Sequence, residues 1–372
     1  MNSQFELEMV IMNVLIVVSS LATTGPGFVV ENFLKIAAGT EYESLGIVIA
    51  TIKDVDANME IEIPSNVEVF RLGDGKQSLS VSAKRLSELV KERKIDLVFS
   101  HGLKSDIISW FTKSQRTLLH VSTSHNNPFE DYTLLYGVKG MIMALMQMVT
   151  FRKMDKVITL NPELYRVHSK WIGKQKTELI PNGVAPVAAN NREHKKRSIP
   201  VFGIVGVYNK RKNQDIILNE FNSEEDTDRR LVVWGNGFEQ WQPKRECHSI
   251  VMKGFSDDKS NIFSSFDVLI SMSKSEGLPL NILEGISAGK ALILSDIPAH
   301  RFIAQFVPSE YVRLVSNETE LKRAIDSFST EKEWMNNVKS VMQDVFEEHF
   351  SAKIMVEKYV ETFRRLYELK AK

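Results

Sequence analysis

Residues 267–296 read DVLISMSKSEGLPLNILEGISAGKALILSD, and this stretch decides the fold. It holds two short apolar runs, at 267–272 and 291–296, and between them Pro279 suits the first turn of a helix. Apolar runs without polar alternation are typical of strands buried on both faces, as in a parallel sheet. A strand, a helix and a second strand in this order predict a right-handed βαβ unit.

The same alternation continues along the whole chain of 372 residues. Segments such as 80–93 and 318–328 have the apolar spacing of helices. A chain of this length exceeds what one hydrophobic core usually supports, so we expect two doubly wound α/β domains. The predicted strands, most of which are near-continuous apolar runs, lie at 14–19, 44–50, 67–72, 96–100, 117–122, 156–160, 201–206, 230–235, 267–272 and 291–296.

One polar, basic and proline-flanked stretch interrupts this series, VAPVAANNREHKKRSIP at 184–200, and it is expected to be a linker. We therefore expect an N-terminal domain at 1–185, a C-terminal domain at 186–350, and a terminal helix at 351–372 that packs back on the first domain. The two parallel sheets are expected to face a central cleft, because open α/β sheets bind ligands at the carboxyl ends of their strands.

Composition excludes several classes of protein. The 47 Lys and Arg residues balance 47 Asp and Glu residues, which gives no reason to expect a nucleic-acid partner. Cys247 is the only cysteine, so neither an internal disulfide nor a cysteine-based zinc motif is possible, and a reducing compartment is favoured. The apolar run at 9–18 is interpreted as a buried first strand instead of a signal peptide, because Glu6 and Glu8 precede it where basic residues would be expected.

The segment between the two strands of the opening stretch has the residues of an anion site. Two glutamates, Glu276 and Glu284, are separated by seven residues and can accept hydrogen bonds from two hydroxyl-bearing parts of one ligand. Gly277 lets the backbone come close to a ligand. Free amides and the helix dipole at a helix start favour an anion such as a diphosphate. The donor-binding residues expected at this helix start are Gly277, Leu278, Pro279 and Leu280.

The stretch EGLPLNILEGISAGKALILSD resembles the signature of family 4 (group 1 type) glycosyltransferases, which have the GT-B fold of two Rossmann-like domains. The resemblance covers nearly the whole chain. It implies that Glu276 is catalytic and contacts the donor sugar, while Glu284 binds the ribose of the nucleotide. It also implies retaining transfer of a hexosyl or N-acetylhexosaminyl group from a UDP- or GDP-sugar, without a metal or other cofactor.

A second stretch, GIVGVYNKRKNQDIIL at 203–218, is similar to the first strand and loop of the family's second domain. In the family this loop brings an arginine and a lysine to the diphosphate. Lys212 falls on the lysine position and is therefore a candidate catalytic residue, whereas Val207 occupies the arginine position. Either Arg211 or Lys210 could replace the missing arginine, because a nearby basic side chain can still stabilise the charge of the leaving group.

Two glycine-containing turns extend the resemblance. The turn in LVVWGNGFE, at 231–239, matches the family's Gly-x-Gly turn near the nucleotide base, and it places Asn236 among the donor-binding residues. The turn TTGPG, at 23–27, looks like the family's loop that closes on the phosphates and the acceptor. Gly25 and Gly27 would permit close backbone approach there, although a simple tight turn is the alternative explanation.

Three histidines lie on or after predicted strands of the first domain. His125 falls where the family often has a histidine near the transferred sugar, so it is a candidate catalytic residue. His101, at a strand end, and His120, within a strand, are more readily structural. Asn182 lies in a segment that ends the first domain, and it is expected to shape the hinge.

Acceptor and location follow from the resemblance and from one methionine-rich stretch. The family includes many enzymes of bacterial surface polysaccharide synthesis, which implies a glycan or undecaprenyl-linked acceptor and a cytoplasmic protein with possible peripheral contact at the inner membrane. The stretch GVKGMIMALMQMVTFRKMDK, at 137–156, fits either an amphipathic helix on a membrane surface or a core helix, and the core helix is favoured.

Other functions remain open. A nucleotide-sugar epimerase on the same fold would need further carboxylates in the first domain, and none is identified. A phosphorylase would normally be longer. A non-catalytic nucleotide-sugar-binding protein stays possible because the usual arginine is missing at Val207. The Asp-x-Asp triplets at 54–56 and 226–228 have the spacing of a metal site in glycosyltransferases of another fold, but they are attributed to chance.

Overall fold

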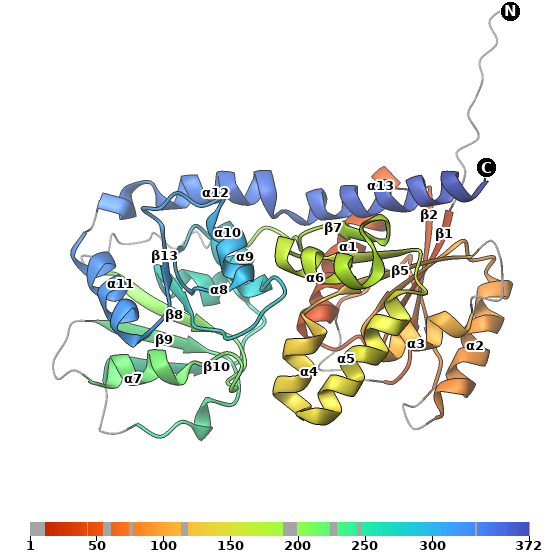
Figure 1. Cartoon of the computed structure of the whole chain (residues 1–372). Helices are drawn as coiled ribbons and strands as arrows, with labels where there is room; N and C mark the ends of the chain where they lie inside the picture. Colours follow the sequence, from red (N-terminus) through yellow and green to blue (C-terminus); the bar gives the residue numbers. More distant parts are fainter. Residues whose placement is uncertain are drawn as a thin grey trace, which may run out of the picture. The chain divides into compact units, whose positions relative to one another are not determined.

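The computed structural model describes residues 12–42, 44–54, 61–73, 77–112, 118–188, 199–223, 229–243, 248–331 and 333–371. The chain forms two compact units. Unit 1 comprises Met1–Leu160, Leu164–Ile180 and Met355–Lys372, and unit 2 comprises Asn161–Glu163 and Pro181–Ile354. Each unit contains one parallel sheet with helices packed beside it (Figure 1). The predicted pair of doubly wound α/β domains is confirmed.

The sheet of unit 1 has the strand order β3-β2-β1-β4-β5-β6-β7, and its neighbouring strands are parallel. Its strands are β1 (Met12–Val18), β2 (Leu45–Thr51), β3 (Glu68–Arg71), β4 (Leu97–His101), β5 (Leu119–Ser124), β6 (Lys156–Thr159) and β7 (Thr177–Leu179). The helices are α1 (Gly25–Ala37), α2 (Leu79–Glu92), α3 (Leu103–Phe111), α4 (Pro128–Tyr136), α5 (Val138–Phe151), α6 (Pro162–Ile172) and α13 (Ala352–Ala371).

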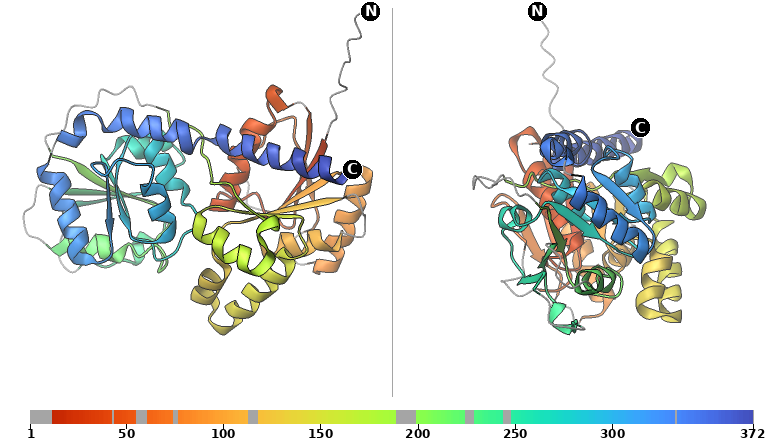
Figure 2. Two further views of the ribbon diagram at one scale, coloured as in Figure 1. Left: turned by 45° about the horizontal axis from the view of Figure 1, so that its top comes forward. Right: turned by 90° about the vertical axis from the view of Figure 1, so that its left-hand side faces the viewer.

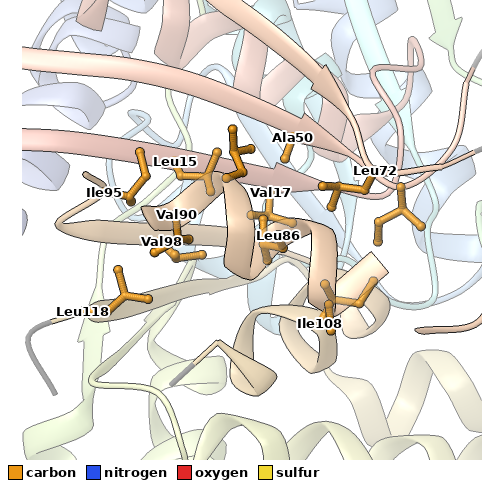
Figure 3. Close-up of a cluster of buried hydrophobic side chains, with 13 residues drawn as sticks. Leu15, Val17, Ala50, Leu72, Leu86, Val90, Ile95, Val98, Ile108 and Leu118 are labelled. Carbon is orange, nitrogen blue, oxygen red and sulfur yellow. The ribbon is translucent and has the colours of Figure 1, made fainter. Parts of the chain in front are cut away.

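One face of this sheet is covered by α2 and α3. Leu15 and Val17 are two residues apart on β1, so both side chains leave the same face of the sheet. Leu86 and Val90 are four residues apart on α2 and meet them there (Figure 3). Val14, Ile16 and Val18, which alternate with them on β1, are buried as well, so the strand is apolar on both faces and its sequence is unbroken apolar from Val14 to Val18.

The last helix, α13, completes the core of unit 1. The rings of Tyr359 and Phe363 pack at centroid distances of 5.2 and 5.3 Å from Phe99, and both also contact Phe33. The hydroxyl of Tyr359 lies 2.9 Å from Oγ1 of Thr123 on β5. Residues from the end of the chain thus pack directly against strands formed near its beginning.

The sheet of unit 2 is also parallel and has the order β10-β9-β8-β11-β12-β13. Its strands are β8 (Val201–Val205), β9 (Arg230–Trp234), β10 (Ile250–Gly254), β11 (Val268–Ser271), β12 (Ala291–Ser295) and β13 (Val312–Val315). Its helices are α7 (Asp215–Ser223), α8 (Lys259–Ser264), α9 (Leu280–Ser287), α10 (Pro298–Ala304), α11 (Glu318–Thr330) and α12 (Val338–His349).

Both sheets have a topological switch point beside their first strand. In unit 2 the chain moves outward from β8 to β9 and β10, and then returns to the other side of β8 with β11. The loops 206–214 and 272–279, which follow β8 and β11, therefore leave neighbouring strands at the same edge of the sheet. Ligands of open α/β sheets bind at such a point.

Several sequence predictions fall outside the described residues or need correction. The triplet at 226–228, most of the linker, and Cys247 lie outside those residues. Asp54 of the other triplet forms an ion pair with Arg71. TTGPG was expected to be a loop, but Gly25 to Gly27 form the first turn of α1. None of the helices in the described ranges is long and apolar enough to cross a bilayer.

Candidate active site

Glu276 is the centre of a charged cluster at the switch point of unit 2. Its Oε2 accepts a hydrogen bond of 2.6 Å from Nη1 of Arg211, and its Oε1 lies 2.7 Å from Nζ of Lys212. Oγ of Ser273 donates to the same Oε1 at 2.8 Å. The glutamate side chain is only 7% exposed. We call these four residues the Glu276 cluster; it joins the loop after β8 to the loop after β11.

The two cations determine the charge of this carboxylate. Burial alone would raise the pKa of Glu276, but Lys212 and then Arg211 outweigh it and lower the pKa to about 2. Glu276 is therefore ionised at neutral pH. A buried carboxylate held by two basic groups is a fixed acceptor for hydroxyl groups, and it leaves one net positive charge in the cluster.

The lowered pKa predicts a pH dependence of stability for unit 2. A carboxylate whose pKa is depressed on folding stabilises the fold above its unfolded pKa, near 4.5, and this stabilisation is lost as the pH falls toward about 2. In Glu276→Gln this component, on the order of 3 kcal/mol, should be absent. Calorimetry should show that the free energy of unfolding of Glu276→Gln falls less steeply between pH 5 and 3 than that of the wild type. The control Glu347→Gln, at an exposed site, should follow the wild type. Superimposable profiles for Glu276→Gln and wild type would contradict the assignment.

The loop after Glu276 presents free backbone amides. Nδ2 of Asn161 donates to the carbonyl of Gly277 at 2.6 Å, and Nδ2 of Asn182 donates to the carbonyl of Leu278 at 2.9 Å. These bonds fix the orientation of the peptide planes. Within the described part of the chain, the amides of Gly277, Leu278 and Leu280 donate no hydrogen bond. The start of α9 thus offers several donors for an anion.

Pro279 lies one residue earlier relative to the helix than the sequence predicts. It is the N-cap of α9, with extended backbone, instead of a residue of the first turn. Nδ2 of Asn281 donates to the carbonyl of Val205 at 2.8 Å, which ties the helix start to the end of β8. The helix terminus is therefore held at the switch point by a contact with the strand itself.

Glu284 lies one turn inside α9, as the spacing predicts, but it already has a partner. Its Oε1 lies 2.6 Å from Nζ of Lys259, and its side chain is 10% exposed. Sequence reasoning missed Lys259, which lies 25 positions before Glu284 and outside the signature. A ligand that binds Glu284 must share it with this lysine or displace the lysine.

Lys210 and Arg211, the two candidate replacements for the missing arginine, lie side by side in the loop after β8 but have different surroundings. Val207 is 58% exposed, and Lys210 is exposed as well. Arg211, in contrast, donates to Glu276 and also to the carbonyl of Ser275 at 2.7 Å. Of these two residues, Arg211 is therefore the one that contacts Glu276.

The Gly-x-Gly turn after β9 packs against the same loop. The amide of Tyr208 donates to the carbonyl of Asn236 at 2.9 Å. A Cβ at Gly235 would lie 2.0 Å from the carbonyl oxygen of Gly206, and Gly235 has a φ of 136°, so only glycine fits. Asn236 itself is exposed. The turn therefore shapes the loop carrying Arg211 and Lys212.

A hydrogen-bond chain behind Glu276 ends at a buried histidine that the sequence did not single out. Nδ1 of His300 lies 3.0 Å from the carbonyl and from Oγ of Ser295, so this nitrogen carries the ring proton. Oγ of Ser295 donates to the carbonyl of Ser273 at 2.6 Å, and Ser273 donates to Glu276. Burial lowers the pKa of His300 to about 4, so the ring is neutral. His300 supports the loop that positions the glutamate.

Unit 1 holds the candidate histidine His125 in a pair. Its Nε2 lies 2.9 Å from Nδ1 of His101, at the end of β4. Nε2 of His101 is buried and has no hydrogen-bond partner among the described residues. Because an orphaned N–H is rarer than an orphaned acceptor, the proton of His101 is on Nδ1 and is donated to His125. The proton of His125 is then on its own Nδ1.

Burial keeps this pair uncharged. It lowers the pKa of His125 to about 4, and burial together with His125 lowers the pKa of His101 well below its ordinary value. His101 therefore positions His125 and sets its tautomer. His120 has a structural place in β5, where its Nε2 lies 3.0 Å from Oγ1 of Thr112.

The two candidate glycines of unit 1 differ. A Cβ at Gly27 would lie 2.0 Å from the carbonyl oxygen of Ala22, so the turn into α1 needs glycine there. Gly25 is exposed, and a Cβ added there would meet no heavy atom within 4 Å, so the local fold does not require glycine. The close approach of Ala22 explains why residue 27 is a glycine. No such contact explains the glycine at position 25, which lies beside open space at the start of α1.

Two parallel-sheet units, each with a topological switch point beside its first strand, are the architecture of the GT-B fold. Sucrose-phosphate synthase from Thermosynechococcus elongatus has this fold, with a TM-score of 0.78 and 16% identity over 96% of this chain and 100% of that one. HepE from Anabaena, solved in complex with UDP and glucose, has a TM-score of 0.74 and 14% identity over 95% of this chain and 100% of that one.

Sequence comparisons identify the family. The model for Glycosyltransferase Family 4 matches residues 48–187, and the model for Glycosyl transferases group 1 matches residues 199–330. An O-antigen biosynthesis glycosyltransferase of Escherichia coli, WclY, is 25% identical over 376 residues, covering 96% of this chain and 99% of the relative. The chain belongs to the group 1, family 4 glycosyltransferases.

Proposed function

We propose that this glycosyltransferase moves a hexosyl or N-acetylhexosaminyl group from a UDP- or GDP-sugar to a glycan or undecaprenyl-linked acceptor, with retention at the anomeric carbon. The supporting observation is the Glu276 cluster beside the free amides of α9. The relative named for O-antigen biosynthesis supports a role in bacterial surface polysaccharide synthesis, at the cytoplasmic face of the inner membrane.

The charges of the site fit the leaving group. Donor cleavage places negative charge on the departing diphosphate, and Lys212, Arg211 and the amides of α9 are the groups that offset it. Glu276 accepts hydrogen bonds from hydroxyls of the transferred sugar, and Glu284 binds the ribose diol. The acceptor hydroxyl attacks from the face that the diphosphate leaves, and its proton passes to the leaving phosphate.

In unit 1, His125 is the proposed contact to the transferred sugar. With its Nε2 occupied by His101, its remaining ring N–H can donate to a sugar oxygen. Gly25 and Gly27 lie at the start of α1, where amides can meet phosphate or acceptor. Asn236 is proposed to lie near the nucleotide base.

A donor screen tests the proposal. Thermal unfolding with UDP- and GDP-sugars should reveal one base that raises the melting temperature, because a ligand bound to the folded state stabilises it by mass action. Labelled sugar from that donor should then transfer to acceptor in cell-membrane extracts. Absence of turnover with every stabilising donor would overturn the enzymatic assignment.

The exposed valine at the family's arginine position favours a second candidate, a non-catalytic nucleotide-sugar-binding protein. The same screen separates the two functions. Nucleotide release that depends on acceptor supports the transferase, whereas donor binding without release supports the binding protein.

The Glu284→Gln variant should bind the donor more weakly. Glutamine keeps the shape but loses the charge that accepts the ribose hydroxyls, and hydrogen bonds to charged groups contribute about 1.5–3 kcal/mol. We expect the KM for the donor to rise about tenfold or more with little change in kcat, since ribose contacts are similar in the ground and transition states. Initial rates against donor concentration measure this. Glu347→Gln, at an exposed site of α12, is the matched control; an unchanged KM in Glu284→Gln would exclude a ribose contact.

A further inference from the structure

Helix α5 has two apolar faces, and only one of them is buried. The buried face packs into unit 1 through Ala144, Met148 and Phe151. At Gly140 the helix approaches α4 so closely that a Cβ would lie 1.8 Å from the carbonyl oxygen of Tyr132. The core-helix interpretation of this methionine-rich stretch therefore accounts for one face of α5 and leaves the other unexplained.

The outward face of α5 is a continuous apolar stripe. Its members are exposed, from 42% at Met141 to 84% at Val138. They recur three and four residues apart, which places them on one side of a helix. The stripe consists of Val138, Met141, Ile142, Leu145, Met146 and Val149.

The end of α4 extends this stripe. Leu134, Leu135 and Tyr136 are all at least 50% exposed and directly precede the turn into α5. The two helices form a hairpin that lies at the outer edge of unit 1 in every view (Figure 1, Figure 2). We call these nine side chains the hairpin ridge. Single exposed apolar residues are ordinary, but a contiguous set of this kind marks an interaction surface.

The charged residues of α5 and of the two positions that follow it are all basic, whereas the exposed acid of the hairpin, Glu130, lies in the first turn of α4 and accepts a hydrogen bond from Asn127. The sequence of α5, VKGMIMALMQMVTF, contains Lys139 and no acidic residue. Arg152 and Lys153 follow its last turn and are exposed. Nζ of Lys153 lies 5.9 Å from the ring centroid of Trp110, which stacks on the exposed ring of Phe111. Cations and aromatic rings at the border of an apolar face suit the interface of an anionic bilayer.

We propose that the hairpin ridge docks on the surface of an anionic phospholipid bilayer, with α5 lying in the plane of the interface. The apolar stripe enters the boundary between headgroups and acyl chains, while Lys139, Arg152 and Lys153 contact lipid phosphates. A second copy of the chain is a poorer occupant. Pairing this face with itself would bring the same cations together, because α5 has no acidic side chain and the exposed Glu130 lies in the first turn of α4, where it accepts a hydrogen bond from Asn127.

The proposed membrane-docking role of the hairpin ridge is inferred from exposure and charge alone, and it does not depend on the donor site. Vesicle co-sedimentation with the full chain tests it, using phosphatidylcholine vesicles with and without phosphatidylglycerol. We expect binding to the anionic vesicles that weakens with added salt. Ile142→Glu/Leu145→Glu should lower binding about tenfold or more. Lys139→Gln/Lys153→Gln should lower binding to the anionic vesicles only.

The matched control is Val81→Glu/Leu369→Glu, which adds the same charges at exposed apolar positions of unit 1 outside the hairpin ridge. It should bind vesicles like the wild type. Melting curves establish that each variant is folded. The proposal is overturned by absence of vesicle binding in the wild type, or by equal loss in the control and the ridge variant. Light scattering without lipid adds a further outcome: a dimer lost in the ridge variant, with no vesicle binding, would assign the ridge to a second copy.

Discussion

Replacing Glu276 with glutamine is expected to lower kcat for sugar transfer by about 100- to 1000-fold. The carboxylate is buried, ionised and held by Arg211, Lys212 and Ser273, so it is fixed before the donor arrives. Glutamine can occupy the same space, but it offers one acceptor oxygen without charge and leaves two cations short of a counter-ion. Single-turnover rates with saturating donor measure the effect on the chemical step.

The comparison that makes this result specific is Glu284→Gln. That variant should chiefly raise the donor KM, whereas Glu276→Gln should chiefly lower kcat. If Glu276→Gln retained full turnover at saturating donor, the glutamate would have no part in the chemistry, and the proposed function would lose its main support.

Replacing Lys212 with methionine is expected to cost about 100-fold or more in kcat, because the leaving diphosphate loses a cation in a site with few others. Nζ of Lys212 lies 2.7 Å from Glu276, at the carboxyl end of β8. Lys210 provides a matched control two residues away in the same loop, since its side chain is exposed. Lys210→Met should leave kcat within about twofold, and Arg211→Met should resemble Lys212→Met.

The double variant Glu276→Gln/Lys212→Met checks whether the two residues act together. Groups that work as one unit give non-additive losses, so the double variant should lose much less than the product of the two single effects. A loss in Lys210→Met equal to that in Arg211→Met would show that the assignment of the two basic residues is wrong.

The fold was largely predictable because its central strands are apolar on both faces. Runs such as NVLIVV before the first turn and ALILS after α9 match β1 and β12 closely. Three strands were not predicted, and all three lie at a sheet edge. In β10 the side chains of Val251 and Met252 are exposed, β13 carries Arg313, and β7 is the short polar segment TEL. An edge strand is partly exposed and does not need a continuous run of apolar residues, so its sequence does not distinguish it clearly as a strand.

The sequence singled out several residues of the candidate site, but not their pairings and not Ser273, Lys259 or His300. The signature placed Glu276 and Glu284 on either side of a helix start, and the loop after β8 supplied Lys212. That Arg211 reaches Glu276 while Lys210 does not depends on the path of one loop, and the pairing of Glu284 with Lys259 joins two helices. The His101–His125 contact likewise joins two strand ends. Such contacts arise from tertiary structure, and no local periodicity encodes them.

The place of α13 has a consequence for how the protein is made. The side chains of Tyr359 and Phe363 complete a core begun by Phe33 and Phe99. The ribosome releases them roughly 10 to 35 seconds after Ile180, at the usual 5–20 residues per second. The aromatic rings of Phe33 and Phe99 therefore stay partly exposed in the nascent first unit while the second unit is synthesised. We expect chaperones to be needed most over this exposed aromatic surface.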